Sequence, residues 1–310
     1  MPFTVHDIPD QTGTLAVITG ATGGLGYETA LALAGAQATV VLTGRNPEKG
    51  ADALVRIRAI HPHADISYET LDLSSLASVE DFARRFAAAH DHLDLLVNNA
   101  GVMMPPTRQT TADGFELQFE TNYLGHFALT ARLVPLLSAA ARGRVVTLSS
   151  IMARRGKIHF DDLQLVAGYT PSAAYGQSKL ACLMFARELQ VRSDTAGLGI
   201  SSFAAHPGIS STNLIENGMG QGSMAARLKP LTGMFFQSPA AGALPTLYAA
   251  TSPDAVPGGY YGPDGFMEMR GTPTAANVPP QARIAADLAR LWTVSEGLAG
   301  VGFPSLAKAA

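Results

Sequence analysis

The stretch SAAYGQSKLACLMFARELQ, residues 172–190, has the pattern of a helix and carries Tyr175 and Lys179 near its start. Residues four positions apart share one face of a helix, so the phenol and the ammonium group are expected to lie one turn apart. A free tyrosine ionises only near pH ~10, and a cation a few ångström away favours the ionised form. The pair could therefore exchange a proton near neutral pH. The alternative is that both side chains simply lie along the helix surface with their polar ends in solvent.

A second group of residues has the spacing of a phosphate-binding loop. Gly20, Gly24 and Gly26 lie between the strand-like run TLAVITG (14–20) and the helical run YETALALAGA (27–36). A glycine-rich turn that leads into a helix lets backbone N–H groups and the helix dipole bind a pyrophosphate. Because the glycines lie in this strand–turn–helix context, they predict a dinucleotide-binding site rather than a simple tight turn.

The end of the second predicted strand indicates which dinucleotide binds. An acidic residue at this position would bind the ribose 2′-OH of NAD, but the chain has Gly44 there, followed by Arg45. A guanidinium can bind a 2′-phosphate through two hydrogen bonds, and the missing carboxylate removes a repulsive charge. The sequence therefore favours NADP over NAD. The alternative is that Arg45 is a solvated loop charge.

Short apolar runs alternate with helical patterns along the chain, which predicts βαβ units. The runs are nearly continuous in apolar residues, as strands covered on both faces should be. We predict an α/β fold with a single doubly wound parallel sheet of the Rossmann type, helices on both faces, and one domain over residues 1–310. The expected strands are 14–20, 38–44, 66–72, 94–101, 143–150 and 199–208, and the expected helices are 27–36, one opened by Asn46 and Pro47, one from about Ser74, one around 112–139 and one containing Tyr175.

A segment of about 209–238 interrupts this alternation and is rich in glycine, methionine and phenylalanine. A long irregular segment in a compact domain is typically a lid or a binding loop, although a helix pair on the core would also fit. Its apolar residues predict a small hydrophobic carbonyl or alcohol as the substrate. They are Leu214, Met219, Met224, Leu228, Met234, Phe235 and Phe236.

Composition narrows the classes of function. The chain is 47 % hydrophobic and 15 % charged, with a net charge of −3 and no long basic run, which argues for a well-packed core and against nucleic-acid binding. Its single cysteine, Cys182, excludes an internal disulfide and fits a reducing compartment. The sequence lacks a signal-peptide pattern, a run of ~20 apolar residues and a clustered metal-ligand motif. We therefore expect a cytoplasmic location, no membrane span and no metal.

Taken together, the motifs resemble the short-chain dehydrogenase/reductase family over nearly the whole chain. Several runs (YLGHF, SAAYGQSKLA, GGYYGPDG and ARLWTVSEGLAG) are most similar to the branch that contains retinol dehydrogenases and protochlorophyllide reductases. The resemblance implies an oxidoreductase that moves a hydride between nicotinamide and a ketone, an aldehyde or the matching alcohol. The matching pieces are T-G-x-x-x-G-x-G at 19–26, Asp72, N-N-A-G at 98–101, Asn122, Ser150, Y-x-x-x-K at 175–179 and P-G-x-x-x-T at 207–212.

The resemblance also assigns catalytic roles. Tyr175 would be the general acid and base, and Lys179 would support it and hold the nicotinamide ribose. Ser150, rather than its neighbour Ser149, would donate to the substrate oxygen from the carboxyl end of a strand. Asn122 would support a water that connects Lys179 to solvent. One departure is that Ser150 and Tyr175 are farther apart than in many members, which leaves residues 153–168 as an insertion that could shape the mouth of the site.

Further residues are implied to contact the cofactor. Asp72 could contact the adenine or cap the following helix, Ile209 would pack on the nicotinamide ring, and Asn98 would tie neighbouring strands together rather than touch a ligand. The cofactor-binding residues implied by the resemblance and by the loop are Gly20, Thr22, Gly23, Gly24, Leu25, Gly26, Arg45, Asn46, Asp72, Leu73, Asn99, Ala100, Gly101, Tyr175, Lys179, Pro207, Gly208, Ile209 and Thr212.

Three expectations concern rivals and partners. Cys182 is expected in the core, and its position three residues after Lys179 departs from the protochlorophyllide reductase pattern, which argues against a light-driven reaction. The resemblance suggests a homodimer that pairs through the Asn122 and Tyr175 helices. The rival functions are a dinucleotide-sensing protein without turnover, which would not need the proton relay of Ser150, Tyr175 and Lys179, and a nucleotide-sugar epimerase or dehydratase.

Overall fold

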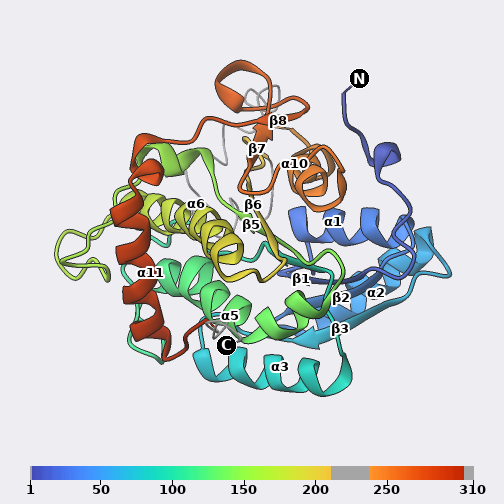
Figure 1. The fold of residues 1–310 in the computed structure, drawn as a ribbon, viewed down its shortest axis with the longest axis horizontal. Helices are drawn as coiled ribbons and strands as arrows, with labels where there is room; N and C mark the ends of the chain where they lie inside the picture. The colour runs from blue at the N-terminus through green and yellow to red at the C-terminus, as the bar shows by residue number, and fades with distance from the viewer. Residues whose placement is uncertain (1, 211–236, 304–310) are drawn as a thin grey trace.

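One eight-stranded sheet organises the part of the chain that the structure, a computed structural model, describes: residues 2–210 and 237–303. The strand order is β3-β2-β1-β4-β5-β6-β7-β8; all neighbours run parallel except β7 and β8, which are antiparallel (Figure 1). The strands are β1 (Leu15–Thr19), β2 (Thr39–Gly44), β3 (Ile66–Thr70), β4 (Leu95–Asn98), β5 (Arg144–Leu148), β6 (Ser201–Ala205), β7 (Tyr260–Pro263) and β8 (Pro273–Ala275).

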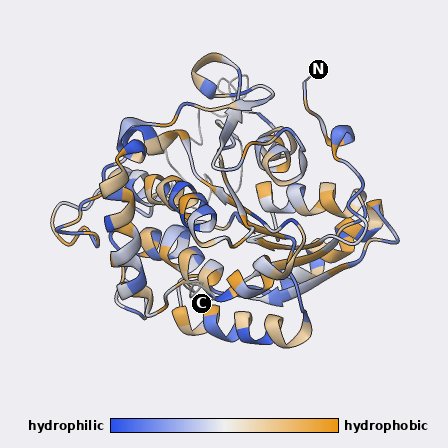
Figure 2. Cartoon of the chain, in the orientation of Figure 1, coloured by the Kyte–Doolittle hydropathy of each residue, from blue (hydrophilic) through white to orange (hydrophobic). Residues whose placement is uncertain are grey.

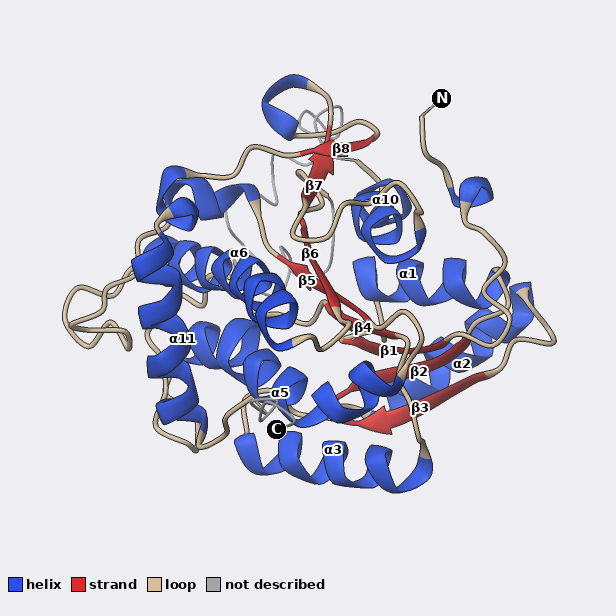
Figure 3. Cartoon of the chain, viewed as in Figure 1, coloured by secondary structure: helices blue, strands red, loops and turns tan. Residues whose placement is uncertain are grey.

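Helices cover both faces of this sheet (Figure 3). One face carries α1 (Gly24–Gly35), α2 (Pro47–Ile60) and α10 (Pro239–Thr251). The other carries α3 (Leu76–Ala89), α5 (Gly125–Ala139), α6 (Pro171–Ala196) and α11 (Ala285–Ala299). The shorter helical segments are η1 (Val5–Asp7), α4 (Leu117–Phe119), the π-helix η2 (Glu120–Leu124), η3 (Ile151–Arg155), η4 (Phe266–Glu268) and η5 (Pro280–Arg283).

Alternation of side chains along buried strands explains the two-sided core. In β1, Leu15 and Val17 join the apolar cluster beneath α3, α5 and α6, whereas Ala16 and Ile18 join the cluster beneath α1 and α10. Successive residues of a strand point to opposite faces, so a strand covered on both sides must be apolar at every position. The hydrophobic colour of the central strands in Figure 2 reflects this requirement. The predicted doubly wound sheet is confirmed.

Local signals in the sequence set several helix ends. Asn46 caps α2 by accepting from the Lys49 N–H at 2.9 Å, with Pro47 at the first helical position, as predicted. Gly197, at φ +65°, ends α6 in the left-handed conformation that glycine adopts without steric cost.

One alternative for Asp72 and one expected helix start were wrong, whereas the helix expected from about Ser74 begins at Leu76. Asp72 does not cap α3: its carboxylate closes a turn by accepting from Ser74, and Ser75 is the capping residue. The helix expected around 112–139 begins only at α4, because the buried carboxylate of Glu116 caps the N–H groups of Gln118 and Phe119.

The helix α11 packs across α5 and α6. Its Trp292 is 1 % exposed and lies edge-on to Phe127 of α5 and stacked on Phe185 of α6. A hydrogen bond of 2.6 Å joins the Tyr123 and Ser295 hydroxyls beside this aromatic cluster. Any pairing of two chains through α5 and α6 would have to use surface that α11 leaves uncovered, and the homodimer stays a prediction. Among the described residues, no helix is long and apolar enough to cross a membrane.

Candidate active site

The predicted site residues follow neighbouring strands at one edge of the sheet. The glycine loop follows β1, Asn99 follows β4, Ser150 follows β5 and Pro207 follows β6. These four strands are adjacent and parallel, so their carboxyl ends meet, and open parallel sheets bind ligands at that edge.

Tyr175 and Lys179 lie on α6 and face the protein interior. They are 6 % and 5 % exposed, and the Lys179 Nζ is 6.0 Å from the centre of the Tyr175 ring. The ammonium group donates to the carbonyl oxygen of Leu148 at 3.0 Å, which ties α6 to the end of β5. Two side chains this deeply buried are not lying along a solvent-facing surface, so that alternative is wrong. A cation held beside a buried phenol is an arrangement suited to proton transfer.

The two serines after β5 have different surroundings. Ser149, 3 % exposed, donates its hydroxyl to the carbonyl oxygen of Lys179 at 2.8 Å. Ser150 accepts from the Met152 N–H at 3.2 Å as the cap of η3, which leaves its hydroxyl hydrogen without an acceptor among the described residues. Ser150 is therefore the serine able to donate to a substrate oxygen.

Asn122 lies inside the π-helix η2 and is 1 % exposed. Its side-chain amide binds the backbone of Val102 through both groups, N–H to Oδ1 at 2.7 Å and Nδ2 to the carbonyl at 3.0 Å. Its main-chain carbonyl accepts from His126 Nδ1 at 2.9 Å and from Cys182 Sγ at 3.1 Å. Asn122 thus fixes the backbone after β4, and its link to a water stays a prediction. Cys182 lies in the core, as expected.

His126 was missed by sequence reasoning, although its position four residues after Asn122 on one helix was a usable signal. It is 1 % exposed, and its Nε2 lies 2.8 Å from the hydroxyl of Thr19. Because Nδ1 must donate to the Asn122 carbonyl, Nε2 accepts the Thr19 hydrogen. Burial lowers the pKa of His126 to about 3, so the ring is neutral. It connects the end of β1 to the Asn122 helix.

The glycine loop is shaped for two different purposes. Gly20 and Gly24 have φ values of +64° and +56°, which favour glycine. A side chain at Gly26 would overlap the Asn99 amide and lie 2.6 Å from the carbonyl oxygen of Gly20, so this glycine permits close packing of α1 on the sheet. A side chain at Gly23 would meet no atom of the described residues within 4 Å.

Among the described residues, the space over Gly23 is open at the N-terminus of α1, where unpaired helix N–H groups can bind an anion. No described residue requires glycine at this position, whereas a pyrophosphate lying against the backbone would. The loop therefore fits a dinucleotide. Leu25, two residues after Gly23, packs against the apolar cluster beneath α1.

The end of β2 fits a phosphate. Arg45 is exposed and makes no hydrogen bond or ion pair with any residue that the structure describes. The preceding Gly44 brings no carboxylate, and its missing side chain lets Thr22 pack closely, since the Thr22 methyl would lie 3.1 Å from a Cβ there. An exposed, uncommitted guanidinium with no carboxylate beside it suits a ligand phosphate. The side-chain oxygen of Asn46 already accepts the hydrogen bond that caps α2.

The residues after β4 are fastened to β1. The amide of Asn99 donates to the carbonyl oxygen of Thr19 at 2.7 Å, and the Ala100 N–H donates to the Thr19 hydroxyl at 2.9 Å. Asn98 donates to the hydroxyls of Thr130 and Thr147, on α5 and β5, which confirms its role in tying neighbouring elements. These bonds hold the floor of the site in place.

Three more predicted residues border the same edge. A side chain at Gly101 would lie 3.0 Å from the Asn122 Oδ1 and 3.6 Å from the Lys179 Nζ. Asp72, partly buried, closes the turn described above, and Leu73 is 4 % exposed beneath α5.

After β6, Gly208 has φ +64°, and a side chain there would overlap the carbonyl of Met269. The Ile209 N–H donates to that same carbonyl at 2.7 Å. Thr212 and the apolar residues of the predicted 209–238 loop, from Leu214 to Phe236, lie outside the described residues.

Comparison of the sequence with known proteins identifies the family. The family model for short chain dehydrogenases matches residues 14–219, more than half of the chain. The chain belongs to the short chain dehydrogenase family.

Curated relatives of this short chain dehydrogenase include retinol dehydrogenase 12 of Mus musculus, which is 41 % identical over 93 % of this chain and 87 % of the relative. The polyprenol dehydrogenase of Danio rerio is 38 % identical over 81 % of this chain and 78 % of the relative. These similarities confirm the resemblance to the retinol dehydrogenase branch.

Two solved structures show the same fold. An uncharacterised protein from Mycobacterium Paratuberculosis is 37 % identical, with a TM-score of 0.81 over 98 % of this chain and all of that one. The Pseudomonas aeruginosa RhlG/NADP active-site complex is 25 % identical, with a TM-score of 0.63 over 80 % of this chain and 94 % of that one.

The insertion between Ser150 and Tyr175 of this short chain dehydrogenase contacts the segment between β4 and α4. Gln164 accepts from the Glu116 N–H at 2.7 Å, and its carbonyl accepts from the Arg108 Nε at 2.9 Å. The insertion is thereby anchored to the connection between β4 and α4.

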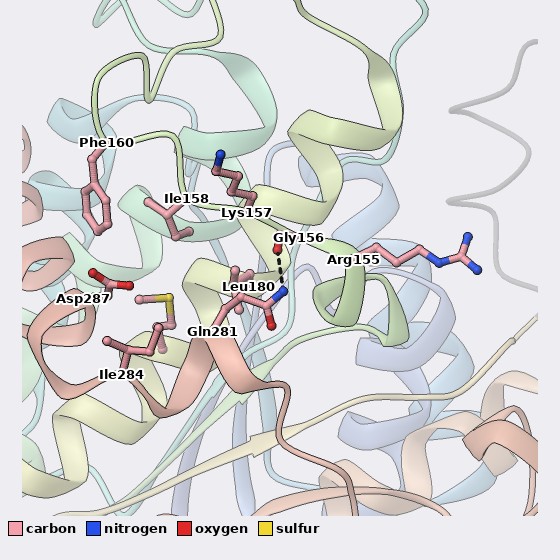
Figure 4. Close-up of a pocket in the computed structure, with 10 residues that line it drawn as sticks. Arg155, Gly156, Lys157, Ile158, Phe160, Leu180, Gln281, Ile284 and Asp287 are labelled. Atoms are coloured by element: carbon pink, nitrogen blue, oxygen red, sulfur yellow. Dashed lines mark hydrogen bonds between the residues drawn. The ribbon is translucent and has the colours of Figure 1, made fainter.

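A cavity of about 410 Å³ lies between residues 155–160, α6 and the start of α11 (Figure 4). Leu180 and Met184 line it from α6, whereas none of the proposed catalytic residues does. Figure 4 shows the Arg155 side chain directed away from the other lining residues. The cavity is therefore separate from the proposed active site. Among the described residues, no three potential metal ligands lie together.

Proposed function

We propose that this short chain dehydrogenase is an NADP-dependent oxidoreductase that interconverts a hydrophobic aldehyde or ketone and its alcohol. The observation that carries the proposal is the buried Tyr175–Lys179 pair beside the uncommitted hydroxyl of Ser150. A dinucleotide sensor has no need of such a group, and a nucleotide-sugar epimerase would be expected to hold its cofactor permanently.

The choice of NADP rests on Arg45. Its exposed guanidinium has no partner within the described residues, and no carboxylate ends β2. Arg45 would bind the 2′-phosphate, and the open backbone at Gly23 would bind the pyrophosphate. The Pseudomonas aeruginosa RhlG/NADP active-site complex, which has a similar fold, supports this choice.

In this proposal the nicotinamide supplies or accepts the hydride. Ser150 donates a hydrogen bond to the substrate oxygen, which orients it and stabilises the negative charge that develops there. The Tyr175 Oη gives its proton to that oxygen in reduction and takes it back in oxidation. Lys179, fixed by the Leu148 carbonyl, keeps a positive charge beside the phenol while the proton moves.

The proposed substrate is a long apolar alcohol or aldehyde of the isoprenoid type. The names of the relatives, retinol dehydrogenase and polyprenol dehydrogenase, support this class. The apolar composition of residues 209–238 also supports it. We further propose that residues 1–310 work as one oxidoreductase domain in the cytoplasm.

NADPH consumption with retinal, a short polyprenal and small ketones tests the proposal, with Tyr175→Phe beside the parent. We expect turnover that is fastest with the isoprenoid aldehydes and falls by about 10²-fold or more in Tyr175→Phe, because general acid catalysis is removed. Tight NADPH binding without turnover on any carbonyl or alcohol would instead favour the sensor. Dinucleotide that stays bound through purification would favour the epimerase.

A further inference from the structure

A buried charged cluster lies next to the proposed site and is used by none of the steps above. Glu268, 8 % exposed, accepts from His206 Nε2 at 2.8 Å and forms an ion pair with Arg154. Its other oxygen accepts from the N–H of Asn277 at 3.0 Å and from the Asn277 side-chain amide at 2.7 Å. One carboxylate therefore joins three segments that are distant in sequence.

Two of these segments lead directly into the active site. Arg154 belongs to η3, the helical turn that Ser150 caps. His206 immediately precedes residues 207–209, the stretch expected beside the nicotinamide. The Tyr260 ring, 5.2 Å from that of His206, carries a hydroxyl that donates to the Ser150 carbonyl at 3.4 Å. Glu268 thus connects the serine side of the site with the nicotinamide side.

Hydrogen bonds fix the protonation of His206. The Gly208 N–H donates to Nδ1 at 3.2 Å, so Nδ1 is the acceptor and the hydrogen lies on Nε2, which donates to Glu268. Burial lowers the pKa of His206, which agrees with a neutral ring. A chain of directed bonds therefore runs from Glu268 through His206 to the backbone of Gly208.

The backbone around Glu268 is held in an uncommon conformation. Met267 and Glu268 have φ values of +51° and +58°, which side chains with a Cβ rarely adopt. The next residue, Met269, presents its carbonyl to the Ile209 N–H at 2.7 Å. The left-handed turn is thus what brings both the carboxylate and this carbonyl against residues 206–209. Strained backbone that is kept in place by many contacts is typical of functional positions.

We propose that Glu268 is a positioning residue for hydride transfer. Through His206 it fixes residues 207–209, and through Arg154 it fixes the turn that follows Ser150, so that substrate oxygen and nicotinamide are held in one geometry. This inference rests on the proposed oxidoreductase function. It predicts that loss of Glu268 impairs the nicotinamide end of the site and spares the adenosine end, where Arg45 and Gly23 lie.

The test compares Glu268→Gln with Asp264→Asn. The control lies in the same loop, where the Asp264 carboxylate accepts from the Thr272 N–H and hydroxyl and makes no bond to His206. We expect Glu268→Gln to lower kcat on the order of 10-fold or more, because small displacements of reacting groups are costly. Its affinity for adenosine 2′,5′-bisphosphate, which lacks nicotinamide, should remain at the parent value. Asp264→Asn should resemble the parent in both respects.

Two results would overturn the inference: a kcat for Glu268→Gln close to that of the parent, or an equal loss of kcat in Asp264→Asn. If Glu268→Gln does not fold, Arg154→Met serves instead, since it breaks only the link to the serine side and should lower kcat without changing bisphosphate affinity. An unchanged kcat in that variant would equally contradict the proposal.

A nitrogen NMR measurement of His206 separates this inference from the proposed function. The parent should show a neutral ring with its hydrogen on Nε2, and Glu268→Gln should shift the Nε2 signal, because Nε2 loses its charged acceptor. This result would support the fixed bond chain even if no carbonyl substrate were turned over, an outcome that would count against the oxidoreductase alone. A protonated His206 in the parent at neutral pH would overturn the bond chain and the inference with it.

Discussion

The hydroxyl of Ser149 donates to the carbonyl oxygen of Lys179 at 2.8 Å, so one of two adjacent serines is committed to the backbone of α6. Ser150, the next residue, only accepts, from the Met152 N–H, among the described residues. Two neighbouring serines thus differ in their hydrogen bonds: one ties α6 to the end of β5, and the other keeps the hydroxyl hydrogen that we propose donates to the substrate.

Replacing the two serines separately tests this division. Ser150→Ala should reduce kcat/KM by about 10²-fold or more, because a donor to the developing oxyanion is lost. Ser149→Ala should leave kcat/KM within a few-fold of the parent and lower the free energy of unfolding by about 1 kcal/mol, because a buried carbonyl loses its donor. Steady-state kinetics and urea unfolding of both variants provide the measurement. A large kinetic loss in Ser149→Ala alone would reverse the assignment.

Replacement of Arg45 should change the preference for cofactor. Arg45→Ala should raise the Kd of NADPH by roughly 10- to 100-fold, the value of a charge-assisted hydrogen bond, and leave the Kd of NADH nearly unchanged. Fluorescence titration with both dinucleotides measures the effect. Lys49→Ala, which removes another exposed cation near the same helix start, is the matched control and should change neither constant. If Arg45→Ala raised the Kd of both dinucleotides equally, Arg45 would not be the residue that binds the 2′-phosphate.

Two glycines of the phosphate loop should respond differently to alanine. Gly26→Ala places a Cβ against Asn99 and the Gly20 carbonyl, so the free energy of unfolding should fall by about 1–3 kcal/mol, as overpacking does. The Cβ of Gly23→Ala would meet no atom within 4 Å in the part of the chain that the structure describes, so stability should be kept while NADPH affinity falls. Thermal unfolding and NADPH titration distinguish the two. Undiminished NADPH binding by a folded Gly23→Ala would contradict the loop assignment.

Glu120 should make stability depend on pH. It is fully buried, and burial raises its pKa from 4.5 to about 7. The unfolded chain therefore releases this proton first as the pH rises, and stability from the neutral carboxyl is lost between about pH 4.5 and 7. Glu120→Gln removes this loss and should increase the free energy of unfolding at pH 8 by about 1–3 kcal/mol, with little effect at pH 4.

Urea unfolding of the parent and Glu120→Gln at pH 4, 5.5, 7 and 8 measures this difference. Glu48→Gln removes an exposed carboxylate near the start of α2 and is the control that should follow the parent curve. Parallel curves for the parent and Glu120→Gln over the whole range would show that Glu120 ionises as an exposed carboxyl does.

The elements that local chemistry determines were predictable. Apolar runs predicted six strands, and Asn46 with Pro47 predicted the start of α2. The location of the site followed from the parallel strands, because their carboxyl ends must meet at one edge of the sheet. The strands β7 and β8 were not predicted, because runs of three or four residues carry too little periodicity to distinguish a strand from a turn. The capping of α4 by Glu116 was also not predicted, because glutamate is an unusual N-cap residue.

Prediction of the site was likewise limited to residues that are close in sequence. Tyr175 and Lys179 lie one turn apart on one helix, so their proximity follows from spacing alone. His206 and Glu268 are 62 positions apart, and only the return of the chain from β7 to β8 brings them together. Spacing in a single sequence carries no information on such a contact.

The placement of α11 has a consequence for biosynthesis. The Tyr123 hydroxyl bonds to that of Ser295, 172 positions later, and Trp292 seals the aromatic side chains of α5 and α6. At ~5–20 residues per second, a ribosome needs roughly 10–30 s to make the intervening chain. During that interval Phe127 and Phe185 have no final cover, so the growing polypeptide presents an adhesive apolar surface to chaperones. Premature termination before Trp292 should therefore yield an aggregating product, even though every proposed catalytic residue has already been translated.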